Sequence, residues 1–378
     1  MKIVYLVESK FCKRDFDRFG LKTLEGRGYK DIEVWDFSAW FRPHYYRTFF
    51  PKDAITGGNY KSVSSSREAR NLLEQLPNKS LFIFIFKPNI KSILIFNYLH
   101  ANNHLYGFLS IGHYPCHSVL SRVKQILREP AFLIEKLVNS IVVKAYSLVS
   151  QPIEADFVIL GGSISGSPYI GINTTLLKAH TLDYDLFLSS DNDSKIFSKG
   201  IVFLDDYGPY HPDSTNRFKV NASNYYATLN RFFDALELNL GMEIVIAPHP
   251  RSDYESKGNP FNGRIISKLS TIQTVKNASV VISHASTAIN FAVLFNKPIL
   301  FMSNSFYPSY SREISRHTAN FFNKRVLDVS ASELNISDSD LEIDHKIYKS
   351  YKELYIKKSG TPEKPVWEIF ADYLDFIA

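Results

Sequence analysis

The chain has 378 residues, of which 45% are hydrophobic and 22% charged, a composition that excludes a disordered or fibrous protein. Lysine and arginine exceed aspartate and glutamate by only 44 to 38, and this small excess without a basic run argues against a nucleic-acid-binding protein. The two cysteines, Cys12 and Cys116, are too few for a disulfide framework or a cysteine zinc site.

The apolar segments of the chain are short. The run that begins the sequence reaches a charge at Glu8, which is too early for the core of a secretion signal. The most apolar stretches, residues 81–86 and 92–99, fall well below the roughly 20 residues that a membrane-spanning helix needs. We therefore expect a cytoplasmic protein.

In the first half of the chain, short runs of β-branched and aromatic residues alternate with segments of helical period. This alternation indicates βα units and a parallel sheet. The predicted strands are residues 2–8, 32–37, 81–86, 106–111 and 156–160, and the predicted helices are residues 14–25, 66–76, 90–102 and 120–147. Residues 40–65 are rich in aromatic residues, Gly and Ser but have no period, so we expect a long loop there.

The alternation begins again after residues 189–194, whose Ser, Asp and Asn are typical of a linker. The predicted strands of this half are residues 200–204, 243–247, 279–283 and 298–302, and the predicted helices are residues 222–240 and 287–295. Near the end of the chain, Trp367, Phe370 and Tyr373 recur at helical spacing.

These patterns predict an α/β fold with two Rossmann-like domains that face each other across a cleft. A chain of this length is long enough for two hydrophobic cores. We expect an N-terminal domain at residues 1–190 and a C-terminal domain at 191–347. Residues 348–378 are expected to form a helical segment that packs back on the N-terminal domain.

Residues 118–149 combine Lys and Arg with apolar residues at helical spacing. One interpretation is a pair of amphipathic helices, divided near Pro130, that pack on the sheet and keep a basic face in water. The other is peripheral contact with an anionic membrane surface on the inner face of the cytoplasmic membrane.

Ligands of open α/β sheets bind beyond the carboxyl ends of the strands, and this rule selects two loops. The first follows residues 243–247 and carries His249 and Arg251, whose cationic or donor groups suit a phosphate. Pro248 and Pro250 fix the backbone on both sides of His249. A structural turn with a satisfied histidine is the alternative.

The second loop follows residues 279–283 and reads Ser283-His284-Ala285-Ser286-Thr287. Ser286 and Thr287 are favourable N-cap residues for the helix that we expect next, and helix amino ends bind phosphate. Ser286 as a plain helix cap is the alternative. We expect Ser283, His284, Ser286 and Thr287 to lie around a nucleotide phosphate.

A strand followed by His249-Pro250, then a strand followed by the hydroxyl pair Ser286-Thr287, resembles GT-B glycosyltransferases of bacterial surface polysaccharides. The closest resemblance is to the sialyltransferase, polysialyltransferase and ulosonate transferase group. The acidic pair of that group would fall on Asp205-Asp206, with Tyr207 between the pair and Gly208. The resemblance covers about residues 200 to 305.

The resemblance implies an inverting, metal-independent transferase without a cofactor, whose C-terminal domain binds a nucleotide-sugar and whose N-terminal domain binds the acceptor. Asp205 or Asp206 would be the catalytic base and His249 would assist the departing phosphate. Pro248, Pro250, Arg251, Ser283, His284, Ser286 and Thr287 would line the donor site. A CMP-activated nonulosonic acid is the favoured donor, and a surface polysaccharide or lipid-linked glycan is the expected acceptor.

Other polar residues lie near the expected hinge or at loops. His180, Asp183 and Asp185 could contribute a rival base, because a strand there would place both carboxylates on one face. Gly161 and Gly162 could offer amides to a phosphate, or form a plain tight turn. The Asp-x-Asp sequences at 191–193 and 338–340 are interpreted as loop composition, so no metal is expected.

Three other functions remain open from the sequence. A CDP-glycerol-type glycerophosphotransferase has a similar layout, and a nucleotide-sugar epimerase can share the two-domain shape. A binding protein that has the fold but no catalysis is the third. The sequence leaves the oligomeric state open.

Overall fold

The computed structural model describes residues 1–77, 79–115, 130–149, 153–190, 200–211 and 221–377. The chain forms two compact units, and neither is one continuous stretch of sequence. Unit 1 consists of Met1–Ile111, Glu129–Leu182 and Lys358–Ala378, and unit 2 consists of Gly112–Arg128 and Asp183–Lys357.

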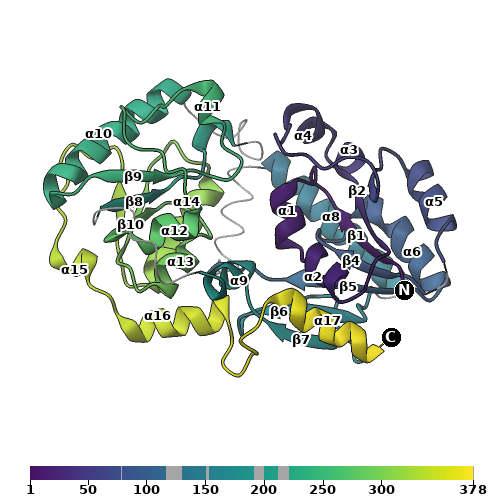
Figure 1. Ribbon diagram of the computed structural model, residues 1–378. Coiled ribbons are helices and arrows are strands. Elements are labelled where there is room, and N and C mark those ends of the chain that lie inside the picture. Colours follow the sequence, from purple (N-terminus) through teal and green to yellow (C-terminus); the bar gives the residue numbers. More distant parts are fainter. Residues whose placement is uncertain (78, 116–129, 150–152, 191–199, 212–220, 378) are drawn as a thin grey trace. The chain divides into compact units, whose positions relative to one another are not determined.

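Unit 1 is built on a seven-stranded parallel sheet with the order β3-β2-β1-β4-β5-β6-β7 (Figure 1). Its strands are β1 (Ile3–Val7), β2 (Ile32–Asp36), β3 (Tyr60–Ser62), β4 (Leu81–Phe84), β5 (Leu105–Ser110), β6 (Phe157–Gly161) and β7 (Thr175–Ala179). The central strands are buried on both faces, which is why they are almost continuously apolar in sequence.

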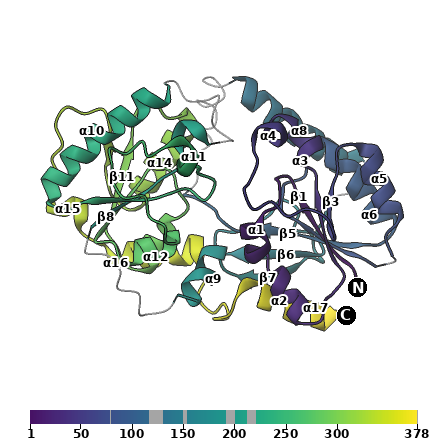
Figure 2. The ribbon, with the colours of Figure 1, turned by 45° about the horizontal axis from the view of Figure 1, so that its top comes forward.

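Helices cover both faces of this sheet (Figures 1 and 2). One face packs against α1 (Lys13–Arg18), α2 (Leu21–Gly26) and α17 (Val366–Ile377), and the other against α5 (Ser66–Glu74), α6 (Ile93–Ala101) and α8 (Pro130–Val149). Val143 of α8 is buried, whereas Leu137, Val138 and Ile141 are exposed. Residues 116–129 lie outside the described residues, so the predicted helix at 120–147 is tested only from α8 onward.

Two predictions for unit 1 are wrong. The predicted helix at 14–25 is two helices separated at Gly20, whose φ of +66° and tight contact with Trp367 leave no room for a side chain. The predicted loop at 40–65 contains α3 (Ser38–Phe41), α4 (Pro43–Thr48) and strand β3. The short 3₁₀ helix η1 (Ile90–Ser92) precedes α6, and strand β7 has no counterpart in the prediction.

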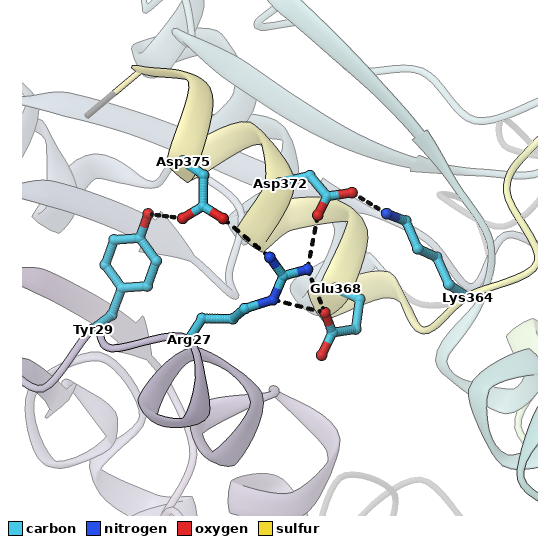
Figure 3. Close-up of polar contacts among 6 residues, drawn as sticks. All are labelled: Arg27, Tyr29, Lys364, Glu368, Asp372 and Asp375. Carbon is cyan, nitrogen blue, oxygen red and sulfur yellow. Dashed lines mark hydrogen bonds and ion pairs between the residues drawn. The ribbon is translucent and has the colours of Figure 1, made fainter.

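Helix α17 is fixed to unit 1 by an apolar and a polar set of contacts. Trp367 packs on Tyr5 with its ring centroid 5.7 Å away and donates from Nε1 to the carbonyl of Arg18 at 2.7 Å. On the surface, the guanidinium of Arg27 contacts three carboxylates of the helix, and Tyr29 and Lys364 complete the network (Figure 3). The carboxylates belong to Glu368, Asp372 and Asp375.

Unit 2 is built on a five-stranded parallel sheet with the order β12-β11-β10-β8-β9. Its strands are β8 (Ile201–Leu204), β9 (Ile244–Ala247), β10 (Val280–Ser283), β11 (Ile299–Ser303) and β12 (Val326–Asp328). One face packs against α10 (Ala222–Leu240) and α11 (Tyr254–Lys257), and the other against α12 (Thr271–Lys276), α13 (Ile289–Leu294), α14 (Ser309–Phe321), α16 (His345–Tyr351) and the π-helix η4 (Lys352–Ile356).

The predicted architecture of two Rossmann-like α/β units, with a C-terminal helix that returns to the first, is therefore confirmed. Most of the predicted linker at 189–194 falls outside the described residues. Among the helices that the structure describes, none has both the length and the apolar composition that crossing a membrane requires.

Candidate functional site at the strand ends of unit 2

The strand order of unit 2 reverses between β8 and β10. The chain passes from β8 to β9 on one side of the sheet and then returns to place β10 on the other side of β8. Loops that leave the sheet at such a point diverge to opposite faces. The crevice that this opens, at the carboxyl ends of the strands, is where α/β sheets bind ligands. Asp206 follows β8 and His284 follows β10, so these two side chains lie on either side of the reversal.

Asp206 and His284 form a hydrogen-bonded pair across this point, with Oδ2 and Nδ1 3.2 Å apart. The His284 ring is buried and stacks on Tyr307 with ring centroids 3.5 Å apart, and the Tyr307 hydroxyl lies 2.9 Å from that of Tyr225. The Nε2 atom of His284 has no hydrogen-bond partner among the described residues. Such an orphaned buried group is rare in folded proteins and is a typical feature of a ligand site.

The environment of Asp206 keeps its carboxylate charged. Burial alone would raise its pKa, but the hydrogen bond and the charge of His284 outweigh burial, so the pKa lies below its usual value. Its Oδ1 also accepts the amide of Gly208 at 3.1 Å. The side chain remains 23% exposed, so a ligand can reach it.

Asp205, the neighbouring carboxylate, has a different environment. It is 4% exposed and accepts three hydrogen bonds: from the amide of Tyr207 at 3.0 Å, from the hydroxyl of Tyr254 at 2.8 Å and from the amide of His249 at 3.4 Å. Burial, followed by the charge of Asp206, raises its pKa to about 7. Asp205 therefore connects the loops that follow β8 and β9.

The backbone directly after the two carboxylates is strained. Tyr207 has a φ of 59°, in the left-handed region that bulky residues rarely adopt. The hydroxyl of Tyr207 accepts the amide of Asp253 at 3.2 Å, which helps to hold this conformation. A Cβ on Gly208 would lie 2.8 Å from the ring of Tyr225, so the position accepts only glycine without rearrangement. Strain of this kind is common at functional sites.

His249 lies on the loop that follows β9, as the sequence predicts. Its Nδ1 accepts the amide of Arg251 at 3.1 Å, so a neutral ring carries its proton on Nε2. The ring contacts the edge of His211 at a centroid distance of 4.8 Å. Pro248 and Pro250 flank it, and His249 and Arg251 are both half-buried. In that tautomer Nε2 of His249 carries the hydrogen of the ring.

The loop after β10 differs in part from the prediction. Helix α13 begins at Ile289, with Ala288 as its N-cap and no side-chain cap. The Ser286 hydroxyl accepts the amide of Ala288 at 3.2 Å, so Ser286 closes a turn ahead of the helix and does not cap it. Thr287 is exposed. Ser283 is buried, and its Oγ has no hydrogen-bond partner among the described residues.

Several tyrosines of this site could not be predicted from the sequence motifs. Tyr254 reaches it from α11, Tyr307 from the loop after β11 and Tyr225 from α10, and the sequence does not distinguish them from the other tyrosines among its 22. Tyr114 follows β5 yet belongs to unit 2, where its hydroxyl donates to the carbonyl of Ala285 at 3.0 Å. This contact fixes the loop that carries His284.

The residues near the expected hinge make other contacts. Both ring nitrogens of His180 contact carbonyl oxygens, those of Thr181 and Lys364, inside unit 1. Asp183 and Asp185 lie on a helix, α9 (Leu182–Leu188), and not on the strand that would place both carboxylates on one face. Asp183 accepts a hydrogen bond from Asn290 at 2.9 Å, which fixes α9 to α13.

Gly161 and Gly162 also lie in unit 1, where Gly161 ends β6 and Gly162 has a φ of +68°. A tight turn explains that conformation. Of the two Asp-x-Asp sequences, residues 191–193 lie outside the described residues. The other lies within the short helix α15 (Asp338–Leu341) and not in a loop, and its Asp340 pairs with Arg325 at 2.8 Å.

Comparisons with known proteins give weak similarities. No family model and no curated protein sequence matches the chain. A structure of MnaA from S. aureus with UDP is 12% identical, with a TM-score of 0.48 over 99% of this chain and 97% of that chain. The glycosyltransferase SnogD from Streptomyces nogalater is 10% identical, with a TM-score of 0.47 over 100% and 99%. The UDP-GlcNAc 2-epimerase from Methanocaldococcus jannaschii, in complex with UDP-GlcNAc and UDP, is 10% identical, with a TM-score of 0.45 over 100% of both chains. At these values the similarities assign no activity to this chain.

Proposed function

We propose that the chain is a nucleotide-sugar-dependent glycosyltransferase that inverts the anomeric centre without a metal. The observation that carries this proposal is the convergence of Asp206, His249 and His284 on the carboxyl edge of the unit 2 sheet. A carboxylate and two imidazoles at one such edge supply a proton acceptor and donors for a leaving phosphate.

The surroundings of the two carboxylates support a different role for each. Asp206 is ionised and partly exposed, so it is the group that can accept the proton of an attacking hydroxyl. Asp205 is buried and held by three donors, so it acts as a positioning residue that holds the His249 loop against the Asp206 loop. The donor Nε2–H of His249 would stabilise charge on the departing phosphate.

For the donor we propose a CMP-activated sugar such as a nonulosonic acid, in line with the resemblance carried by His249-Pro250 and Ser286-Thr287. A thermal-shift panel of CMP, CDP, UDP and GDP tests this choice. A ligand that binds only the folded protein stabilises it by about 2.7 kcal/mol at 100 times its Kd. We expect CMP to give the largest rise in Tm. A larger rise with UDP would replace the proposed donor, and no rise with any nucleotide would reject a nucleotide-dependent enzyme.

A transfer assay separates this activity from others on the same fold. We expect release of CMP from a CMP-sugar to require a glycan acceptor. His249→Ala should lower the rate at least about tenfold, because loss of one transition-state donor commonly costs about a hundredfold. The matched control is His345→Ala, which removes an exposed histidine of unit 2. Turnover of a UDP-sugar without an acceptor would instead identify an isomerase, and binding without turnover a catalytically silent protein.

A further inference from the structure

Unit 1 has a reversal of strand order of its own, which the proposed donor chemistry does not use. Strand β1 lies between β2 and β4, so the loops that follow β1 and β4 diverge at the carboxyl edge of the sheet. Each loop carries a lysine: Lys10 follows β1 and Lys87 follows β4. Among the described residues, neither side chain makes a hydrogen bond or an ion pair.

Aromatic residues of the α4 segment hold the ammonium of Lys10 in place. Nζ lies 3.7 Å from the ring centroid of Phe50 and 4.4 Å from that of Tyr46. Burial lowers the pKa of Lys10, although the charge of Asp36 opposes this effect. The oxygens of Asp36 are already engaged, by the amide of Ser38 at 2.7 Å and by the Tyr60 hydroxyl. The ammonium therefore keeps its hydrogen-bonding capacity for another acceptor.

Another lysine of unit 1, Lys91, differs from Lys10 in that its ammonium donates a hydrogen bond to the protein. Its Nζ donates to the carbonyl of Trp40 at 2.6 Å. Lys10 has no such partner, and Phe50 beside it is 72% exposed. A cation without a hydrogen bond or an ion pair, next to an exposed ring at a switch point, combines the two contacts that an acidic sugar needs: a charge for its anion and an apolar surface for its ring.

We propose that unit 1 binds an anionic sugar at this position, with its carboxylate or phosphate on Lys10 and its ring against Phe50. Lys87, on the other side of the switch point, adds positive charge. That this sugar is the acceptor rests on the proposed function; the binding site itself does not.

Isothermal titration without any nucleotide tests the site. Sialyllactose against lactose tests a carboxylate, and mannose phosphate against mannose tests a phosphate. We expect at least one anionic sugar to bind at least about tenfold more tightly than its neutral counterpart, and Lys10→Gln to remove that difference, because hydrogen bonds to charged groups are the strong ones. The matched control Lys30→Gln removes an exposed lysine at the opposite edge of the same sheet, before β2, and should bind like the wild type.

Phe50→Leu provides a second variant, at a position whose side chain is 72% exposed. It should weaken both members of a pair, because it removes the ring surface and not the charge. Equal affinities for anionic and neutral sugars in the wild type would overturn the proposal, as would equal losses in Lys10→Gln and Lys30→Gln. Nucleotide binding is measured separately, so a protein that binds anionic sugars but no nucleotide would reject the proposed function and retain this site.

Discussion

Asp205 and Asp206 are adjacent in sequence, yet their surroundings move their pKa values in opposite directions. The pairing of Asp206 with His284 favours its charged form, whereas burial of Asp205 favours its neutral form. Pairs of carboxylates with separated pKa values are a recurrent feature of sites in which one group reacts and the other supports it.

The two carboxylates should therefore differ in mutational effect. We expect Asp206→Asn to lower kcat by about a hundredfold or more with little change in Tm, because it removes the exposed proton acceptor. Asp205→Asn should lower kcat much less. Steady-state kinetics with a CMP-sugar measure both. A severe loss in Asp205→Asn with a near-normal Asp206→Asn would reverse the assignment.

The pKa of Asp205 also predicts how stability depends on pH. Its value in the folded protein, about 7, exceeds the ordinary 3.8, so between these values the folded state binds more protons than the unfolded state. Protonated Asp205 therefore contributes to the free energy of unfolding. This contribution is complete below about pH 4 and is lost as pH rises through about 7, with an upper bound of about 4 kcal/mol.

Asp205→Asn should remove this fall in stability, which denaturant unfolding at several pH values would measure. Asp206→Asn should not remove it, because the pKa of Asp206 is lowered in the folded protein. A lowered pKa stabilises the folded state above the pKa of the unfolded state, and this contribution is lost only in more acidic solution. An unchanged pH slope in Asp205→Asn would show that this carboxylate does not titrate in the neutral range.

At the scale of elements, both interpretations of residues 118–149 make predictions for helix α8. The buried Val143 fits packing on the sheet, whereas the exposed Leu137, Val138 and Ile141 are the side chains that a membrane surface would contact. We expect Ile141→Glu to lower co-sedimentation with anionic vesicles at least about fivefold. Leu238→Glu, on an 85% exposed side chain of α10, is the matched control and should have no effect. If the wild-type protein does not sediment with the vesicles, α8 is a solvated surface helix.

Strands β8, β9, β10 and β11 of unit 2 could be predicted to within a residue, because parallel strands buried on both faces are short, β-branched runs. Strand β12, three residues long at the edge of that sheet, was missed. The break at Gly20 could not, because its cause is Trp367, a residue distant in sequence. Strand β3 was missed because it is three residues long and only partly buried at one edge of the sheet.

For the candidate site, the strand-end rule places His249 and Asp206 on the correct edge. The rule does not predict the hydrogen bond between Asp206 and His284, because that contact depends on the order of the strands in the sheet. The contribution of Tyr254 could not be predicted either, because Tyr254 and Asp205 are 49 positions apart in the sequence.

At the scale of the whole molecule, α17 contributes to unit 1 alone, so damage to it should be confined to that unit. We expect Trp367→Ala to destabilise unit 1 by about 3–5 kcal/mol, the usual range for removing a buried Trp. Hydrogen exchange measured by peptide should show lost protection in β1 and β6 but not in β8 and β10. Phe376→Ala, at an 88% exposed position of the same helix, is the control. Equal losses in both units would mean that they unfold together.

The bond between Trp367 and Arg18 joins positions that are 349 residues apart. On the ribosome, the apolar face around Tyr5 is translated early but waits for α17, whereas every segment of unit 2 has already been made. Unit 1, although its first strands are made early, thus cannot complete its packing until α17 has been made. Nascent chains that have not yet extruded α17 present an uncovered sheet face, which is a surface that chaperones bind.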